Sequence, residues 1–246
     1  MAAIELDRLT WPEVRAEIQS GRDTVVVAFG ATEQHGPHLP LATDALIGEH
    51  LARRVADELD AFVAPTVRVG CSEHHLAFPG TLSISEETFH SLVADLLRSL
   101  ARGGFRRAVL LPTHGGNFRP LAAALSELGP VEGLQIRALT DLGALFAIAQ
   151  MGADDHGVPL SEGGLHAGEW ETSMLMAIRP DLVQLARGEA GYTGDMEAAA
   201  GAIFGSGVHS VAPNGVIGDP AKASPEHGAR YWEKVTAITL EVIGRP

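Results

Sequence analysis

Short apolar runs alternate with helical patterns through the first part of this 246-residue chain. Residues 24–30, 61–67, 107–112 and 134–140 have the length of strands and are almost continuously apolar, which predicts strands covered on both faces. Between them, leucine and valine recur at helical spacing over residues 46–59 and 92–100. The alternation predicts an α/β fold, a three-layer α/β/α sandwich with a mainly parallel central sheet.

The second half of the chain is less regular. Segments 152–164 and 188–220 contain many glycines and prolines and predict long loops over one end of the sheet. A helix is expected at the end of the chain. Ser224 is its predicted N-cap, Pro225 its first helical residue, and Glu226 lies in its first turn. With 46% hydrophobic residues, residues 1–246 are expected to form a single domain with one core.

Composition excludes several classes of function. The chain has 31 acidic and 18 basic residues, a net charge of −13, and no basic patch, so we expect neither a nucleic-acid nor a membrane partner. No apolar run approaches the roughly 20 residues of a membrane helix. The N-terminus lacks the features of a signal peptide, and Cys71 is the single cysteine. These features predict a cytoplasmic protein.

A first polar motif, Gly-Ala-Thr-Glu-Gln-His-Gly-Pro-His-Leu-Pro-Leu-Ala-Thr-Asp, follows the first predicted strand. Glu33 and His35 are two positions apart, so in an extended segment their side chains point to the same side. Asp44 begins the next helix and can return to the same point. Such donors suit zinc, manganese or iron(II). Taken singly, each residue could instead be a surface ion pair, a loop residue or a helix cap.

A second motif, Leu-Leu-Pro-Thr-His-Gly-Gly-Asn, follows the third predicted strand. His114 can supply a further nitrogen ligand from a neighbouring strand end. The amides of Gly115 and Gly116, near a helix N-terminus, could hold a negative or developing negative charge. The two glycines could equally form a tight turn that binds nothing.

A third motif, Leu-His-Ala-Gly-Glu-Trp-Glu-Thr-Ser, places His166, Glu169 and Glu171 where they could face one pocket. One carboxylate could bind a second metal ion, and the histidine could act as an acid or base. For Glu171, interaction with the dipole of a helix N-terminus is an equally good interpretation.

A fourth stretch, Gly-Cys-Ser-Glu-His-His-Leu-Ala-Phe-Pro-Gly-Thr-Leu-Ser, offers Glu73, His74 and His75 as groups that contact substrate or support the metal ligands. Cys71 could suggest a thiol nucleophile. A small buried cysteine is the commoner case, and we favour it.

Together these motifs resemble the creatininase (creatinine amidohydrolase) family. The match runs through Glu-Gln-His-Gly-Pro-His-Leu-Pro, Phe-Pro-Gly-Thr, His-Gly-Gly-Asn and His-Ala-Gly-Glu-x-Glu-Thr-Ser to a Gly-Asp-Pro near Asp219, and covers nearly the whole chain. The resemblance implies an α/β/α fold, a homohexamer, and a divalent metal site of one or two ions per chain holding zinc, manganese or iron.

Residue by residue, the resemblance implies that the metal ligands are Glu33, His35, Asp44 and His114, with Asp44 as the bridge. His166 matches the histidine associated with proton transfer. In creatininase a glutamate two positions after the matching histidine completes the second metal, whereas Gly116 stands here, and Glu169 looks like its replacement. The tryptophans that pack against creatinine have no clear counterparts, since Trp170 stands in a different place. Other branches, which include deformylases, a peptidase of mycofactocin maturation and hydrolases of cyclic ketones, resemble the chain about as well.

We therefore expect a metal-dependent amidohydrolase that opens a small, cyclic amide or lactam at a non-peptide C–N bond. In this mechanism a metal-activated water attacks the carbonyl, Glu169 or Glu171 steers or deprotonates the water, and His166 protonates the leaving nitrogen. The amides of Gly115 and Gly116 or the side chain of Asn117 would stabilise the oxyanion, with His74, His75 and Trp170 against the substrate. The alternatives are a hydrolase of a C–C or ester bond in a cyclic ketone or lactone, and a non-catalytic metal-binding protein.

Overall fold

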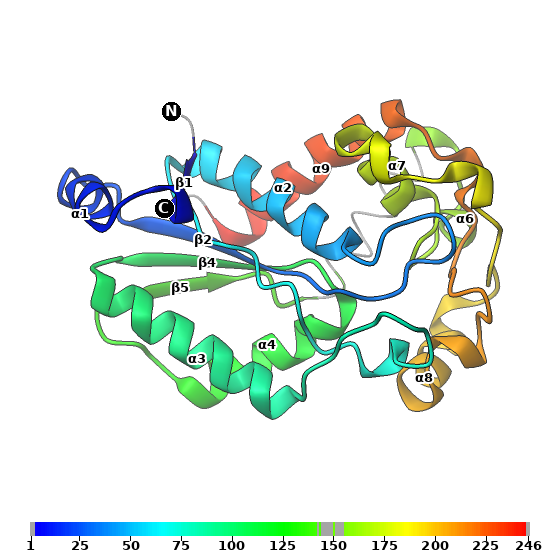
Figure 1. Ribbon diagram of the computed structural model, residues 1–246, viewed down its shortest axis with the longest axis horizontal. Coiled ribbons are helices and arrows are strands. Elements are labelled where there is room, and N and C mark those ends of the chain that lie inside the picture. Colours follow the sequence, from blue (N-terminus) through cyan, green and yellow to red (C-terminus); the bar gives the residue numbers. More distant parts are fainter. Residues whose placement is uncertain (1–2, 142, 144–149, 151–154, 245–246) are drawn as a thin grey trace.

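A parallel sheet forms the centre of the protein in the computed structural model, which describes residues 3–141, 143, 150 and 155–244 (Figure 1). Within these residues the strand order is β1-β3-β2-β4-β5, and every pairing is parallel. The strands are β1 (Ile4–Glu5), β2 (Thr24–Phe29), β3 (Phe62–Val63), β4 (Arg107–Pro112) and β5 (Gln135–Ala138). In the longest pairing, Thr24 lies opposite Arg107 and Phe29 opposite Pro112.

The four predicted strands are all present, but two are shorter than expected. The runs at 24–30 and 107–112 form β2 and β4 at nearly full length, and 134–140 forms β5. Of 61–67 only Phe62–Val63 is a strand, and pairing resumes at a single bridge between Val67 and Phe29. The register shifts by one residue between these points, since Val63 lies opposite Val26 but Val67 lies opposite Phe29, so an extra residue around Pro65 interrupts the ladder.

Helices cover both faces of the sheet, which confirms the predicted α/β/α architecture (Figure 1). One face carries α2 (Thr43–Leu59), α7 (Glu169–Ile178) and α9 (Pro225–Ile243). The other carries α3 (Glu86–Gly103) and α4 (Gly115–Leu128). Also present are α1 (Trp11–Gln19), α6 (Leu160–Gly163), α8 (Met196–Ser206) and the short 3-10 helices Leu6–Arg8, Glu73–His75, Pro180–Leu182, Leu185–Arg187, Val208–Ser210 and Pro220–Lys222.

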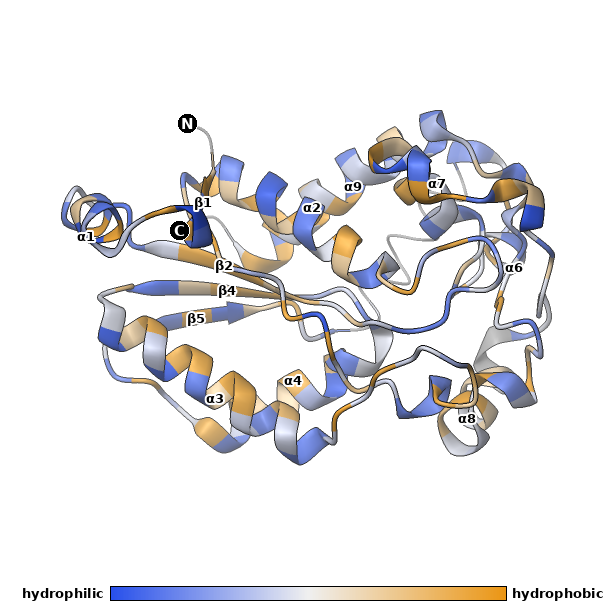
Figure 2. Ribbon diagram, viewed as in Figure 1, coloured by the Kyte–Doolittle hydropathy of each residue, from blue (hydrophilic) through white to orange (hydrophobic). Residues whose placement is uncertain are grey.

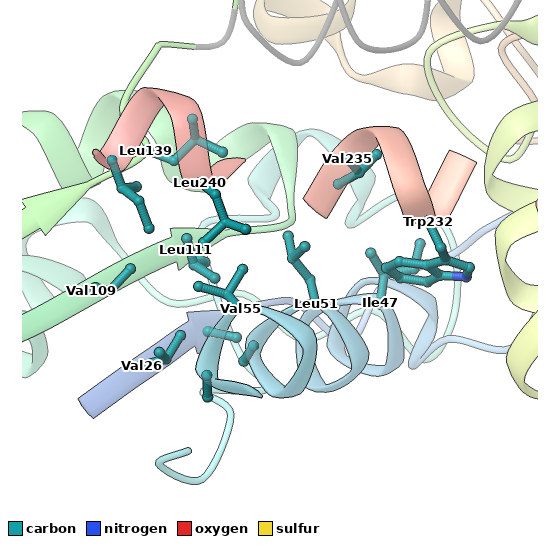
Figure 3. Packing of buried hydrophobic residues seen from close by; sticks show 14 of the residues in the cluster. Val26, Ile47, Leu51, Val55, Val109, Leu111, Leu139, Trp232, Val235 and Leu240 are labelled. Atoms are coloured by element: carbon teal, nitrogen blue, oxygen red, sulfur yellow. The ribbon is translucent and has the colours of Figure 1, made fainter. Parts of the chain in front are cut away.

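The alternation of side chains along β2 divides the core into two layers. All six residues of β2 are buried. Val26 and Ala28 pack with α2 and α9, whereas Val25, Val27 and Phe29 pack with α3 and α4. Figure 3 shows the first layer, in which side chains from the strands meet those of α2 and α9. Figure 2 shows hydrophobic residues alternating with hydrophilic ones along α3, the pattern of a helix with one buried face.

The second half of the chain is more helical than predicted. The expectation of a long loop over 188–220 is wrong in part, because α8 lies within it. Within 152–164, residues 152–154 lie outside the described residues, and 160–163 form α6. The predicted start of the closing helix is confirmed, since Ser224 Oγ accepts a hydrogen bond from the His227 amide at 3.1 Å. Among the described helices, none has both the length and the apolarity that crossing a membrane requires.

Candidate active site

Three motifs meet at the carboxyl ends of β2 and β4. The segment after β2 carries Glu33 and His35 and leads into α2 at Asp44, while His114 follows β4 directly and precedes α4. Because neighbouring parallel strands end at the same edge of the sheet, these side chains are brought together there. The third motif reaches them from α7, which lies at the same end of the sheet (Figure 1).

Asp44 lies between the two histidines of the cluster. Its Oδ1 is 3.3 Å from His35 Nε2, and its Oδ2 is 3.2 Å from His114 Nδ1. Glu33 Oε1 is also 3.2 Å from His114 Nδ1. All four side chains are buried. The four predicted ligands therefore form one compact cluster.

Backbone hydrogen bonds fix the tautomers of the two histidines. His114 Nε2 lies 3.1 Å from the Cys71 carbonyl, and His35 Nδ1 lies 3.1 Å from the Glu33 carbonyl, so each of these nitrogens donates. The other nitrogen of each ring then turns a lone pair towards carboxylates. Glu33 Oε2 is buried with no hydrogen-bond partner among the described residues. Lone pairs and carboxylates facing one another in a buried space fit a bound cation, because the cation would satisfy all of them.

In the absence of a bound ion, the pKa values of the carboxyl groups Glu33 and Glu171 and of the two cluster histidines are raised, so these groups tend to hold protons. Burial raises the pKa of Glu33, and burial raises the pKa of Glu171 to about 7. Burial alone would lower the pKa of His35, but the carboxylates of Asp44, Glu171 and Glu33 together outweigh it and raise this pKa to about 9. Burial likewise opposes protonation of His114, but Glu33 and Asp44 hold its pKa well above the ordinary value. In the metal-free protein, protons would therefore occupy positions that a metal ion could take over.

Glu171 joins the cluster, whereas Glu169 does not. Glu171 Oε2 lies 4.0 Å from His35 Nε2 and 2.5 Å from the amide of Ala167, whose φ of +54° turns that amide towards it. Glu169 points to the opposite side of α7. Its Oε1 accepts hydrogen bonds from Ser173 and His227, and its Oε2 accepts one from Tyr231.

The structure thus contradicts the prediction that Glu169 is a metal ligand or acts on the water. Both of its oxygens are already occupied by donors from α7 and α9, and the side chain is fully buried between those helices. A carboxylate held in this way cannot also reach the cluster. Glu171, which lies next to His35, is the carboxylate of this motif that could act as a further metal ligand.

His166 is held in place by Gln34, a residue that the sequence analysis missed. His166 Nε2 donates to the Gln34 carbonyl at 2.7 Å, which leaves Nδ1 as the free nitrogen, 3.9 Å from Glu33 Oε1. The Gln34 side-chain amide also donates to His75 Nδ1 at 3.0 Å. Burial and the nearby His35 hold the pKa of His166 well below its ordinary value, so its ring is neutral. The position of Gln34 between Glu33 and His35 in the first motif was the available signal.

Among the residues that the structure describes, three groups of side chains place possible ligand atoms within 4.8 Å of one another. They are Glu33–His35–Asp44, His35–His166–Glu171 and Glu33–His75–His166. The last includes His75, whose Nδ1 accepts from Gln34 and whose protonated Nε2 therefore faces Glu33 at 3.4 Å. His75 is thus better placed to hold Glu33 than to bind an ion.

A cavity of about 200 Å³ opens onto the cluster. It is lined by His74, His75, Gly115, His166 and Trp170, all of them predicted site residues. Trp170 is buried, and its indole N–H has no hydrogen-bond partner among the described residues. These residues lie where a substrate next to the cluster would touch them.

Asn117 does not face this cavity, which contradicts its predicted contact with substrate. Its side-chain oxygen accepts from the Cys71 amide, and its side-chain nitrogen donates to the carbonyls of Phe29 and Gly30. The hydrogen bonds of its side chain thus tie α4 to the end of β2 and to the backbone at Cys71. Gly116 lies beside it, where a Cβ would come within 2.3 Å of the Cys71 carbonyl oxygen, so no other residue fits without a backbone shift.

Cys71 is buried, as expected for a small apolar residue. Burial raises the pKa of its thiol to about 11, which keeps it protonated and a poor nucleophile.

Comparisons with known proteins agree with this geometry. Residues 7–243 match the family described as "Creatininase: Creatinine amidohydrolase". The chain is 34% identical to the mycofactocin precursor peptide peptidase of Mycolicibacterium smegmatis (86% of this chain, 80% of the relative) and 32% identical to the creatinine amidohydrolase of Pseudomonas putida (75% of each). A solved structure described as "Creatininase Mn" superimposes with a TM-score of 0.79 at 27% identity and covers 98% of this chain and 97% of that one.

Proposed function

The chain belongs to the creatininase family, and we propose that it is a metal-dependent hydrolase that opens a small amide or lactam by attack of water at this cluster. One observation carries the proposal: the Asp44 carboxylate lies between His114 and Glu33 on one side and His35 and Glu171 on the other. A carboxylate that directs one oxygen towards each of these two pairs of side chains could hold two adjacent metal ions.

Five side chains would hold the metal. Glu33 and His114 would bind one ion, His35 and Glu171 the other, and Asp44 both. Oxygen and imidazole ligands of this kind suit zinc, manganese or iron(II). When bound, such ions lower the pKa of water from about 16 towards ~7 and polarise a carbonyl group.

His166 is placed to move the proton. Because its Nε2–H is committed to the Gln34 carbonyl, only Nδ1 can exchange a proton with groups in the cavity. The neutral ring accepts a proton from the attacking water at Nδ1 and then delivers it to the leaving nitrogen. Glu171, whose second role is to orient the water, replaces Glu169 in this scheme.

Two other groups would position the substrate. The Trp170 indole N–H is a buried donor in need of an acceptor, and a substrate carbonyl or its oxyanion supplies one. The Gly115 backbone lines the cavity at the N-terminus of α4, where the helix dipole favours a developing negative charge.

The bond cleaved is a C–N bond in this proposal. The relatives named as a creatinine amidohydrolase and as a peptide peptidase both point to amide substrates. We propose a small non-peptide amide, and an assay with short peptides tests that restriction directly. A homohexamer is proposed from family resemblance, and sedimentation analysis measures it. The cytoplasmic location stays a prediction.

The test is amide hydrolysis by protein loaded separately with zinc, manganese or iron(II). Creatinine, a simple lactam, an N-formyl amine and a short peptide serve as substrates, and released amine is measured. We expect turnover of at least one amide, loss with a chelator and recovery with added metal. Asp44→Asn should be inactive and metal-poor, and the exposed Asp95→Asn should match the wild type. A lactone and a cyclic ketone are assayed in parallel. If only these compounds are hydrolysed, with release of acid and no amine, the result would favour the C–C or ester reaction instead.

A further inference from the structure

Helix α8 forms an apolar wall opposite the metal cluster. Ala200, Ile203 and Phe204 of α8 line the same cavity as Asp44 and Glu171. Leu165, Val208 and Ile217 complete this side of the cavity. One end of a bound molecule would therefore meet the polar cluster, and the other would meet aliphatic and aromatic side chains.

The wall has its own supporting core. Ile203 packs in a hydrophobic cluster with Ala199, Val208, Ala212 and Ile217 that is separate from the two layers on the sheet. The helix also contacts the short 3-10 helix Glu73–His75, which carries two of the cavity histidines. These contacts on both sides hold α8 next to the cavity, and Ile203 and Phe204 line it.

Phe204 extends the wall to the cavity mouth. Its side chain is 60% exposed, which is unusual for a phenylalanine, and its ring lies 4.9 Å from that of His74. His74 in turn stacks on His114 at 5.6 Å with the rings nearly parallel. A row of rings thus leads from the mouth to the cluster, and a bound apolar group would cover the exposed face of Phe204.

The charged side chains that line the cavity, among the described residues, are acidic apart from the histidines. Among the described lining residues there is no lysine or arginine, while Glu33, Asp44 and Glu171 are acidic. Bound ions would neutralise the acidic groups near the reacting carbonyl. Nothing described on the α8 side could pair with a carboxylate or phosphate carried by the rest of the substrate.

We infer that the α8 wall sets substrate specificity: Ile203 and Phe204 receive an uncharged aliphatic or aromatic substituent next to the amide that is cleaved. This inference rests on the proposed function, since it assumes that the amide binds at the cluster. It names the substrate class as neutral amides with an apolar group, and it disfavours substrates with an anionic group on that side.

Hydroxamic acids test the inference without knowledge of the natural substrate, because they bind catalytic metal ions through the hydroxamate and place their substituent in the pocket. Dissociation constants for metal-loaded protein are measured by calorimetry with acetohydroxamate, benzohydroxamate and the anionic succinic monohydroxamate. We expect benzohydroxamate to bind about tenfold more tightly than acetohydroxamate, because its ring is buried against α8. The succinic compound should bind no more tightly than acetohydroxamate.

Two variants link this preference to α8. Ile203→Ala should reduce the benzohydroxamate advantage, with Val93→Ala as control, since it removes a buried aliphatic group from α3 and should leave the ratio unchanged. Phe204→Lys changes an exposed side chain that the fold tolerates, and it should weaken benzohydroxamate while strengthening the succinic compound severalfold.

The failures are distinguishable. If acetohydroxamate does not bind metal-loaded protein, the site has no open coordination position, and the proposed function falls together with this inference. If acetohydroxamate binds but benzohydroxamate is no tighter, or both α8 variants keep the wild-type ratios, the specificity inference alone is overturned.

Discussion

Glu169 and Glu171 lie two positions apart at the start of α7, yet their carboxylates point in opposite directions. Glu171 faces His35 and the cluster, and Glu169 accepts hydrogen bonds from α9. Two residues along an α-helix are separated by about 200° around its axis, which explains the opposite orientation. Glu169 is therefore a positioning residue, because it ties the outer side of α7 to α9 while the inner side presents Glu171.

Removal of the Tyr231 hydroxyl should weaken this tie. Tyr231→Phe leaves Glu169 Oε2 buried without its 2.7 Å partner, so we expect the free energy of unfolding to fall by about 1–2 kcal/mol. Denaturant unfolding of chelator-treated protein measures it without a contribution from metal binding. Tyr192→Phe is the control, because it removes an exposed tyrosine hydroxyl bond and should cost less than about 0.5 kcal/mol. Equal effects of the two variants would contradict the role of Glu169.

Replacement of His166 should separate proton transfer from metal binding. His166→Gln is expected to lower kcat by about 10²- to 10⁴-fold with metal content intact, since the free Nδ1 is lost. Activity is assayed on the amide identified by the substrate panel, and metal content is measured on the same sample. Loss of an ion from the variant would instead make His166 a ligand, as its place in two of the possible ligand groups allows.

Trp170 offers a test of substrate positioning. Trp170→Phe keeps an aromatic ring in the cavity but removes the unpartnered N–H. We expect kcat/KM to fall about fivefold, the effect of one hydrogen bond, while stability is maintained. An unchanged kcat/KM would show that the indole N–H does not contact the substrate.

The stability of the metal-free protein should depend on His50 in mild acid. Burial, reinforced by Arg54 and Arg53, lowers the pKa of His50 from 6.5 to about 4 in the folded protein. Above pH 6.5 the ring is neutral in both states and contributes no pH dependence. Between pH 6.5 and 4 the unfolded chain binds a proton that the folded protein does not, so stability falls as pH falls.

His50→Gln should therefore flatten the decline of stability across this range. The comparison uses denaturant unfolding of chelator-treated wild type and variant at several pH values between 4 and 7. The ring also packs edge-on against Trp232 at 4.4 Å, so an offset between the two curves is expected at every pH. Only a difference in the slope of unfolding free energy against pH reports proton binding by His50. Parallel curves for the wild type and the variant would rule out the predicted titration.

The sequence predicts much of the fold because strands buried on both faces are continuously apolar and helices buried on one face have apolar residues at helical spacing. The apolar runs of β2 and β4 and the spacing in α2 and α3 define the layers directly. The helix α8 escaped prediction because Gly201 and Gly205 lie within it and its apolar residues are not confined to one side.

The candidate metal cluster was predictable because its proposed ligands lie in short motifs that follow strands. The choice between Glu169 and Glu171 was not predictable, since both carboxylates precede the same apolar stretch. Tyr231 and His227 decide it, and they lie on α9, far along the chain. Asn117 was misassigned for the same reason, because its partners Phe29, Gly30 and Cys71 come from other segments.

Metal content per chain, measured by mass spectrometry on protein purified without added metal and then offered zinc, manganese and iron(II), tests the central claim most directly. We predict close to two ions in the wild type, about one in Glu171→Gln, and two in the matched variant Glu169→Gln. A wild type that binds none of these metals would contradict the metal-dependent account. Loss of an ion from Glu169→Gln but not from Glu171→Gln would contradict the assignment of Glu171 to the site.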